Sequence, residues 1–208
     1  MQDLLRAASS VFARLGYHET TTNAIASEAG VSPATLYQFF PNKEAIASAL
    51  AAMYARQMAD AERALDPECA LAFKDAIHAL IDLCIRFNRE HPEFHTLVVD
   101  APLSDDARGE KQALGQVFVD FIAERLRREQ PGLTRAESWR HGQVALMIFR
   151  GILDELVVAT RSTRPQLQQA MHDAILRYLE PVAAPEKVAL RPRKRKLSAG
   201  EMSTSRRQ

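Results

Sequence analysis

Side chains able to contact a nucleic acid recur at short intervals between residues 20 and 43. The set comprises Thr22, Asn23, Ala34, Thr35, Tyr37, Gln38 and Lys43. Its hydroxyl groups and the lysine ammonium can contact phosphate oxygens. The amides of Asn23 and Gln38 carry the paired donor and acceptor that match the major-groove edge of adenine, and the methyl group of Ala34 can contact a thymine methyl. These residue types predict a surface that contacts DNA.

Two short helices, at about 22–29 and 33–40, would position these side chains. Their packing positions have the spacing of a helix-turn-helix and comprise Ile25, Ala26, Ala29, Gly30, Val31, Leu36 and Phe40. A glycine takes the tight turn at Gly30. We expect residues 20–22 to cap the first helix and Ser32-Pro33 to begin the second. An ordinary helical hairpin with a solvated polar face has the same spacing, so this pattern alone leaves both interpretations open.

The rest of the chain also has helical periodicity, and no strand-like alternation is present. Apolar stripes predict a first helix ending near Gly16, helices at 43–65, 73–90, 93–99 and 139–159, one ending before Pro131, and a last one from Pro165 to before Pro181. Residues 101–109 are predicted to form a loop. The expected fold is all-α, with about nine helices.

The formal net charge of +1 over 208 residues hides an asymmetry. Residues 191–208 carry seven Lys/Arg and one Glu, a net of +6, whereas the other 190 carry 20 basic and 25 acidic side chains, a net of −5. Proline, serine and glycine in this basic segment predict a disordered tail. The tail either adds sequence-independent attraction to DNA or only aids solubility. Deleting residues 191–208 is expected to flatten the salt dependence of DNA binding in the first case alone.

The sequence has neither a membrane-spanning segment nor a secretory signal. No apolar run reaches ~18 residues, and Met1 is followed by a periodic helix rather than a basic and then apolar segment. We therefore expect a cytoplasmic protein. Cys69 and Cys84 are predicted to share one helix, where 15 positions correspond to ~22 Å. A disulfide needs Cα atoms within ~7 Å, so two reduced thiols are expected.

The segment LLRAASSVFARLGYHETTTNAIASEAGVSPATLYQFFPNKEAI resembles the N-terminal domain of TetR-family transcriptional regulators. The matching positions are Ala7-Ala8, Phe12, Gly16-Tyr17, Thr20-Thr21, Ile25-Ala26, Ala29-Gly30-Val31-Ser32, Thr35-Leu36-Tyr37, Phe40 and Lys43-Glu44. This resemblance implies a helix-turn-helix DNA-binding domain at 1–47, a helical effector-binding and dimerisation domain at 48–181, and the basic tail at 182–208.

The resemblance also implies which residues contact DNA. They are Thr22, Asn23, Ser32, Pro33, Ala34, Thr35, Tyr37, Gln38, Phe39 and Lys43. Ala34 stands where glycine is common, and Phe39 stands where histidine or tyrosine often occurs. Phe39 either contacts a thymine methyl or packs inward. Residues 1–47 hold only three basic side chains against four acidic ones, so phosphate attraction by this domain is expected to be modest.

Such proteins usually dimerise to read two half-sites. The last two long helices have more apolar surface than one chain needs, and the predicted dimer interface comprises Val144, Ile148, Ile152, Leu156, Leu167, Met171, Ile175 and Tyr178. The resemblance implies a four-helix bundle made by two subunits. Purely internal burial of these residues, or an interface elsewhere, is the alternative.

Bulky residues of the middle helices could line an apolar effector pocket. The candidates are Phe87, Phe94, His95, Phe118, Phe121, Trp139 and Met147, with His78 and His141 as further groups that could orient a ligand. Each residue could instead belong to the core. Binding of an effector would change the tilt of the helix at 43–65 and thereby the spacing of the two DNA-binding domains.

The predicted function is therefore that of a ligand-responsive regulator. By analogy with the family, it would be a repressor that binds a palindromic DNA operator as a homodimer and is released by a small, mostly apolar effector, without cofactor or metal. One alternative is a constitutive DNA-binding protein with no effector. Another is an enzyme using His91, Glu93, His95 and Asp100, but the sequence has no His-Glu-x-x-His, zinc spacing, nucleophile elbow or phosphate-binding glycine loop.

Overall fold

The computed structural model describes residues 1–94, 97 and 105–184, and these form an all-α fold without strands. The all-α prediction is confirmed. Eight helices have defined bounds: α1 (Gln2–Glu19), α2 (Thr22–Glu28), α3 (Pro33–Phe39), α4 (Lys43–Leu65), α5 (Phe73–Glu90), α7 (Asp105–Glu129), α8 (Arg135–Val158) and α9 (Arg164–Ala183). Residues 92–94 form a further helical turn.

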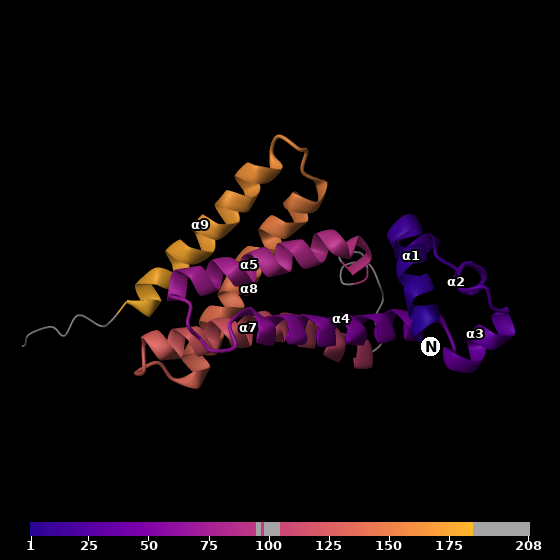
Figure 1. Ribbon diagram of the computed structural model, residues 1–208, viewed down its shortest axis with the longest axis horizontal. Helices are drawn as coiled ribbons and strands as arrows, with labels where there is room; N and C mark the ends of the chain where they lie inside the picture. Colours follow the sequence, from indigo (N-terminus) through magenta and orange to yellow (C-terminus); the bar gives the residue numbers. More distant parts are fainter. Residues whose placement is uncertain (95–96, 98–104, 185–208) are drawn as a thin grey trace, which may run out of the picture.

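The first three helices, called the head below, lie at one end of the molecule (Figure 1). The long helix α4 leaves the head and runs beside α7, which in turn packs against α8. Helix α8 also packs along α9, and this pair projects from the body beside α5. One continuous apolar core extends from the head to α9. The head is thus packed directly onto the helices that follow it.

Capping groups and glycines set several helix ends where the sequence predicted them. The side chain of Asn42 accepts a hydrogen bond from the backbone of Ala45 at 2.8 Å, and α4 spans the predicted 43–65. Helix α5 spans the predicted 73–90. Gly16 has a φ of +74°, and the chain kinks there before one more turn ends α1.

Three helix boundaries differ from the prediction. Residues 105–109, predicted as loop, are the start of α7, while 101–104 lie outside the described residues. Helix α8 begins at Arg135 instead of Trp139, because Thr134 and Glu137 form a capping box. Helix α9 continues through Pro181, a position in its last turn, instead of ending before it.

The placement of Cys69 was also predicted wrongly. It precedes α5 in a connecting loop, with a φ of +52°, whereas Cys84 is buried within α5. Both thiols are free, as expected. Among the helices described, none is long and apolar enough to cross a membrane.

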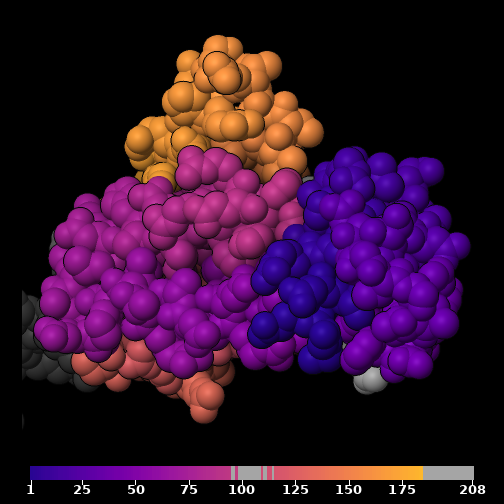
Figure 2. Space-filling view, turned by 45° about the vertical axis from the view of Figure 1, so that its right-hand side comes forward, coloured from indigo at the N-terminus to yellow at the C-terminus, as the bar shows by residue number. Residues whose placement is uncertain are grey.

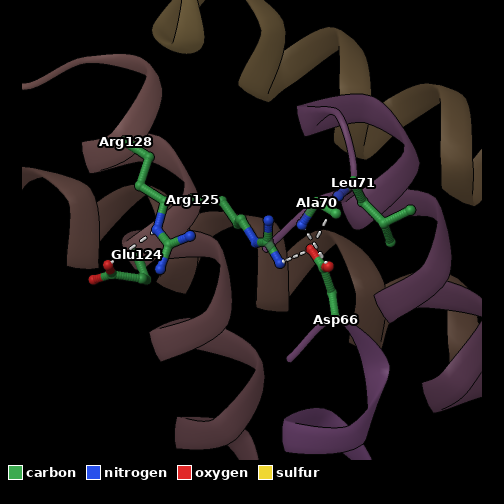
Figure 3. A network of polar contacts seen from close by, with 6 residues as sticks. All are labelled: Asp66, Ala70, Leu71, Glu124, Arg125 and Arg128. Atoms are coloured by element: carbon green, nitrogen blue, oxygen red, sulfur yellow. Dashed lines mark hydrogen bonds and ion pairs between the residues drawn. The ribbon is translucent and has the colours of Figure 1, made fainter. Parts of the chain in front are cut away.

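A buried ion pair fixes the end of α4 against α7 (Figure 3). The guanidinium of Arg125 on α7 donates to the Asp66 carboxylate, and both side chains are more than nine-tenths buried. The backbone N–H groups of Ala70 and Leu71 donate to the same carboxylate at 2.8 and 3.3 Å. Desolvation alone would raise the pKa of Asp66, but these hydrogen bonds outweigh it and hold the pKa below its ordinary value.

This depressed pKa predicts how stability depends on pH. Because the pKa of Asp66 is lower in the folded than in the unfolded chain, its contribution is present above the unfolded value of ~3.9 and is lost as pH falls through the folded value. We expect Asp66→Asn to lower the thermal midpoint at pH 7. The difference in thermal midpoint between Asp66→Asn and the natural protein should become smaller below about pH 4. Thermal unfolding of both proteins between pH 7 and pH 3 measures this difference. A difference that stays constant with pH would contradict the depressed pKa of Asp66.

Candidate nucleic-acid interface

The turn between α2 and α3 is built by caps and by one glycine. The Thr21 hydroxyl accepts from the backbone N–H of Ala24 at 3.1 Å, and the Ser32 hydroxyl accepts from that of Thr35 at 3.1 Å. Gly30 takes a φ of +67°, a conformation that favours glycine. Beneath the turn, Ile25, Ala26 and Leu36 are buried. The predicted helix-turn-helix packing is present in the structure, with α3 held rigidly on α2.

The outer face of α3 carries the predicted DNA-contact residues. Asn23, Ser32, Pro33, Ala34, Tyr37, Gln38 and Phe39 are exposed, whereas Thr22 and Thr35 are half-buried. The hydroxyls of Thr22 and Tyr37 hydrogen-bond to each other at 2.9 Å, as do those of Ser32 and Thr35. Phe39 is 51% exposed and does not pack inward. These nine residues belong to α2, to α3 and to the turn between them.

Lys43, the tenth predicted contact, has a partner that the sequence did not reveal. Its ammonium donates to the backbone carbonyls of Tyr17 and His18 at 2.8 and 3.2 Å and lies 4.4 Å from the centre of the Tyr17 ring. Burial, followed by the nearby charge and hydrogen bond of Glu44, raises the pKa of Tyr17 to about 12. Lys43 therefore caps the end of α1 and joins it to the start of α4.

Arg6 and Arg14, the two Lys or Arg side chains of the head, also have intramolecular partners. Arg14 on α1 pairs with Glu28 on α2 at 3.1 Å, and Arg6 pairs with Asp3 at 3.1 Å. Both pairs are at least partly exposed and contribute little to stability. Uncharged side chains therefore dominate the surface that α3 presents.

The predicted effector-pocket residues that the structure describes have different surroundings. Phe121 and Trp139 line a hollow of about 450 Å³ between α4, α7 and α8, which also carries five arginines and four acidic residues. Phe87 and Phe94 pack against each other, 5.5 Å between ring centres, and Phe118 packs on Phe149 at 5.2 Å. Met147 is 62% exposed.

Two of the three predicted histidines have partners within the chain. His95 lies outside the described residues. His78 Nδ1 is 2.7 Å from His172 Nδ1, and His141 Nδ1 is 2.8 Å from the Tyr178 hydroxyl. These contacts join α5 to α9 and α8 to α9. The two histidines thus connect helices within one chain.

The predicted dimer residues separate into two groups. Met171 and Ile175 are fully buried within one chain and Leu156 nearly so, which leaves them almost no surface for a partner. They hold α9 and α8 in the core, because the apolar stripe of each helix faces inward. Val144, Ile148, Ile152, Leu167 and Tyr178 are only partly buried. Val158 is 77% exposed and was not among the predicted interface residues, although Met147, Gly151 and Val158 follow helical spacing.

Two of the four residues considered for an enzyme, His91 and Glu93, lie in the described part of the chain. Glu93 is buried and accepts hydrogen bonds from Ser9 and Tyr54, and His91 Nδ1 lies 3.5 Å from its carboxylate. His95 and Asp100 lie outside the described residues. Within residues 1–94, 97 and 105–184, no group of three or more His, Cys, Asp or Glu side chains is placed to hold a metal ion.

Two family models match the chain. Residues 4–50 match the model of bacterial regulatory proteins of the tetR family, and residues 73–179 match that of the tetracyclin repressor-like C-terminal domain. The chain is 30% identical over 89 residues to YhgD, an uncharacterized HTH-type transcriptional regulator of Bacillus subtilis, covering 42% of this chain and 46% of YhgD. It is 26% identical over 125 residues to YvkB of the same organism, covering 57% and 64%. The matches thus span about half to two-thirds of these curated relatives.

Solved structures have the same fold. A TetR-family regulator from Streptomyces coelicolor superposes with a TM-score of 0.70 at 18% identity, covering 87% of this chain and 98% of the other. FadR from Bacillus subtilis, in complex with stearoyl-CoA, superposes with a TM-score of 0.63 at 21% identity, covering 86% and 96%. PfmR from Thermus thermophilus superposes with a TM-score of 0.62 at 24% identity, and the match covers 84% of this chain and 94% of PfmR. At these identities the likeness concerns the fold.

Proposed function

Because this chain belongs to the TetR family of transcriptional regulators and carries its DNA-binding helix-turn-helix, we propose that it represses transcription from a palindromic operator and is released by a small effector. The observation that carries the operator-reading part is the outer face of α3, a capped and rigid helix whose polar side chains point away from the core. Repression and effector release rest on analogy with the family.

We assign α3 to the major groove. Gln38 and Asn23 are exposed amides suited to adenine, and exposed Ala34 suits a thymine methyl. The paired hydroxyls of Thr22 and Tyr37 would exchange their mutual hydrogen bond for phosphate oxygens. Phe39, exposed and without a polar group, suits a thymine methyl or a deoxyribose.

The proposed dimer interface is the outer face of α8 together with the exposed side of α9. Met147 is 62% and Val158 77% exposed, with the small Gly151 between them on the same face. Partly buried Val144 and Ile148 adjoin this stripe. A second copy covering these apolar side chains would remove them from water, which favours association.

For the effector, the most concrete guide is FadR, which was solved with stearoyl-CoA. We include long-chain acyl-CoA thioesters among the candidates. A constitutive regulator without effector is the second candidate function. It is supported by the aromatic candidates Phe87, Phe94 and Phe118, whose rings pack against other rings of the same chain. Thermal-shift measurements against acyl-CoA thioesters and apolar compounds separate the two, because a ligand of the folded state raises the melting temperature.

The decisive experiment is selection of bound duplexes from a random pool, with and without these compounds. We expect an inverted repeat whose half-sites lie about one helical turn apart or more. A compound that reduces its recovery supports release by an effector. Recovery of no preferred sequence at moderate salt would overturn the proposal.

A further inference from the structure

Glu93 is a buried carboxylate that contacts two helices far from it in sequence. Its Oε1 accepts a hydrogen bond from the Ser9 hydroxyl of α1 at 2.8 Å and another from the Tyr54 hydroxyl of α4. Glu93 is only 3% exposed and Tyr54 1%. A charge buried to this degree requires hydrogen-bond donors to be tolerated. One oxygen atom therefore joins the head, the long helix α4 and the chain beyond α5.

Aromatic rings surround Tyr54, which donates a hydrogen bond to this carboxylate. The ring of Tyr54 lies 5.8 Å from those of Phe87 and Phe94 and 5.0 Å from that of His91. Burial, then the hydrogen bond to Glu93, raises the pKa of Tyr54 well above its ordinary value of 10. The hydroxyl consequently remains protonated and donates to Glu93 throughout the physiological pH range.

The Ser9–Glu93 hydrogen bond connects the head to a part of the chain beyond α4. Within the described part of the chain, it is the one direct polar contact between the head and any residue beyond α4. Beside it lies a hollow of about 470 Å³ between α1 and α4, lined by Gln2, Arg6, Ser9, Met53, Tyr54, Gln57 and His91. Figure 2 shows the head against the surface formed by the following helices. Apolar packing and the Lys43 contacts hold α1 on α4, and the Ser9–Glu93 hydrogen bond adds a link from α1 to the chain beyond α5.

We propose that Glu93 is a positioning residue for operator reading, which sets the angle of the head on the body through Ser9. This inference rests on the proposed function, because head orientation matters only if two heads read one operator. In a dimer, that angle determines the separation and relative rotation of the two α3 helices. Fixed heads accept one half-site spacing, whereas loosely held heads accept several.

The test measures affinity for the selected operator and for the same operator with one or two base pairs inserted at its centre. Each added pair rotates one half-site by roughly 34° relative to the other. We expect the natural protein to bind the altered operators at least about 30-fold more weakly. We call the affinity for the selected operator divided by that for the altered operator the spacing ratio. Ser9→Ala removes the hydrogen-bond donor and Glu93→Met removes the acceptor, and each should reduce the spacing ratio to about threefold.

Two variants serve as controls. Ser10→Ala is the matched serine change, because the Ser10 hydroxyl contacts Glu28 inside the head, and it should keep the spacing ratio of the natural protein. Glu93→Gln retains an oxygen that can accept both hydrogen bonds and should restore most of the ratio. If Glu93→Met does not fold, Ser9→Ala decides the question, because it leaves the Tyr54–Glu93 hydrogen bond in place.

The outcomes separate this inference from the proposed function. If folded Ser9→Ala keeps the spacing ratio of the natural protein, the positioning role is wrong although operator reading stands. If the natural protein binds all spacings equally well, the head is not fixed and the inference also fails. If the natural protein has no preferred sequence, the proposed function fails and this inference fails with it.

Discussion

Replacement of Gln38 by alanine is expected to weaken binding to the selected operator by about 30-fold or more. Gln38 is exposed at the centre of the outer face of α3 and has no hydrogen-bond partner among the described residues. Its amide can therefore pair with one base without breaking an internal contact. One bidentate base contact contributes about 1–3 kcal/mol, and a dimer loses two, so the loss is roughly 2–6 kcal/mol.

The measurement is a fluorescence-anisotropy titration with the selected operator and with an unrelated duplex of equal length. Binding to the unrelated duplex should change little, because Gln38 is uncharged and nonspecific binding depends on phosphate contacts. Gln112→Ala, an exposed glutamine on α7, is the matched control and should leave both affinities unchanged. Equal losses on both duplexes would show that Gln38 does not read a base.

Replacement of Gly142 by valine is expected to lower the free energy of unfolding by about 3 kcal/mol, toward the upper end of the range for overpacked cores. Gly142 lies where α8 crosses α7, and a Cβ atom at this position would be 2.7 Å from the carbonyl oxygen of Val119. Backbone at such a crossing cannot move without separating the helices. Urea unfolding followed by circular dichroism measures the change at fixed protein concentration.

Gly109 provides the control for this prediction. It also lies in a helix, α7, but is exposed, and no atom lies within 4 Å of a Cβ built there. Gly109→Ala should therefore stabilise the protein by up to about 1 kcal/mol, the difference in helix propensity. If Gly142→Val is as stable as the natural protein, α7 and α8 do not cross as closely as the structure indicates.

The sequence predicted those parts of the fold in which local chemistry determines the structure. Helix α4 has its predicted bounds because Asn42 caps it and Asp66-Pro67 follows it. The turn before α3 was predictable because Gly30 and Ser32 each have one local role. The exposed face of α3 could be predicted because the apolar packing positions of the helix identify its buried side. Such features depend on neighbours within a few residues.

Other features depend on contacts between distant segments, which one sequence does not reveal. The charge of Lys43 suggested a phosphate contact, yet its ammonium is 2.8 Å from the carbonyl oxygen of Tyr17. An apolar stripe shows that Met171 is buried but not whether its own chain or a partner covers it. Met147 follows the same periodicity and is exposed. The start of α7 was missed because Gly109 suggested a loop, although a helix tolerates one glycine at modest cost.

The internal pairing of Arg6, Arg14 and Lys43 bears on how the protein finds its site. Because both arginines of the head and the neighbouring Lys43 are already paired, α3 and its neighbours displace few condensed counterions from a duplex. Weak, salt-driven adhesion is what allows many regulators to slide along random sequence. A head of this kind has little such adhesion of its own. It is therefore expected to reach its target mainly by repeated three-dimensional encounters, each ending quickly unless the bases match.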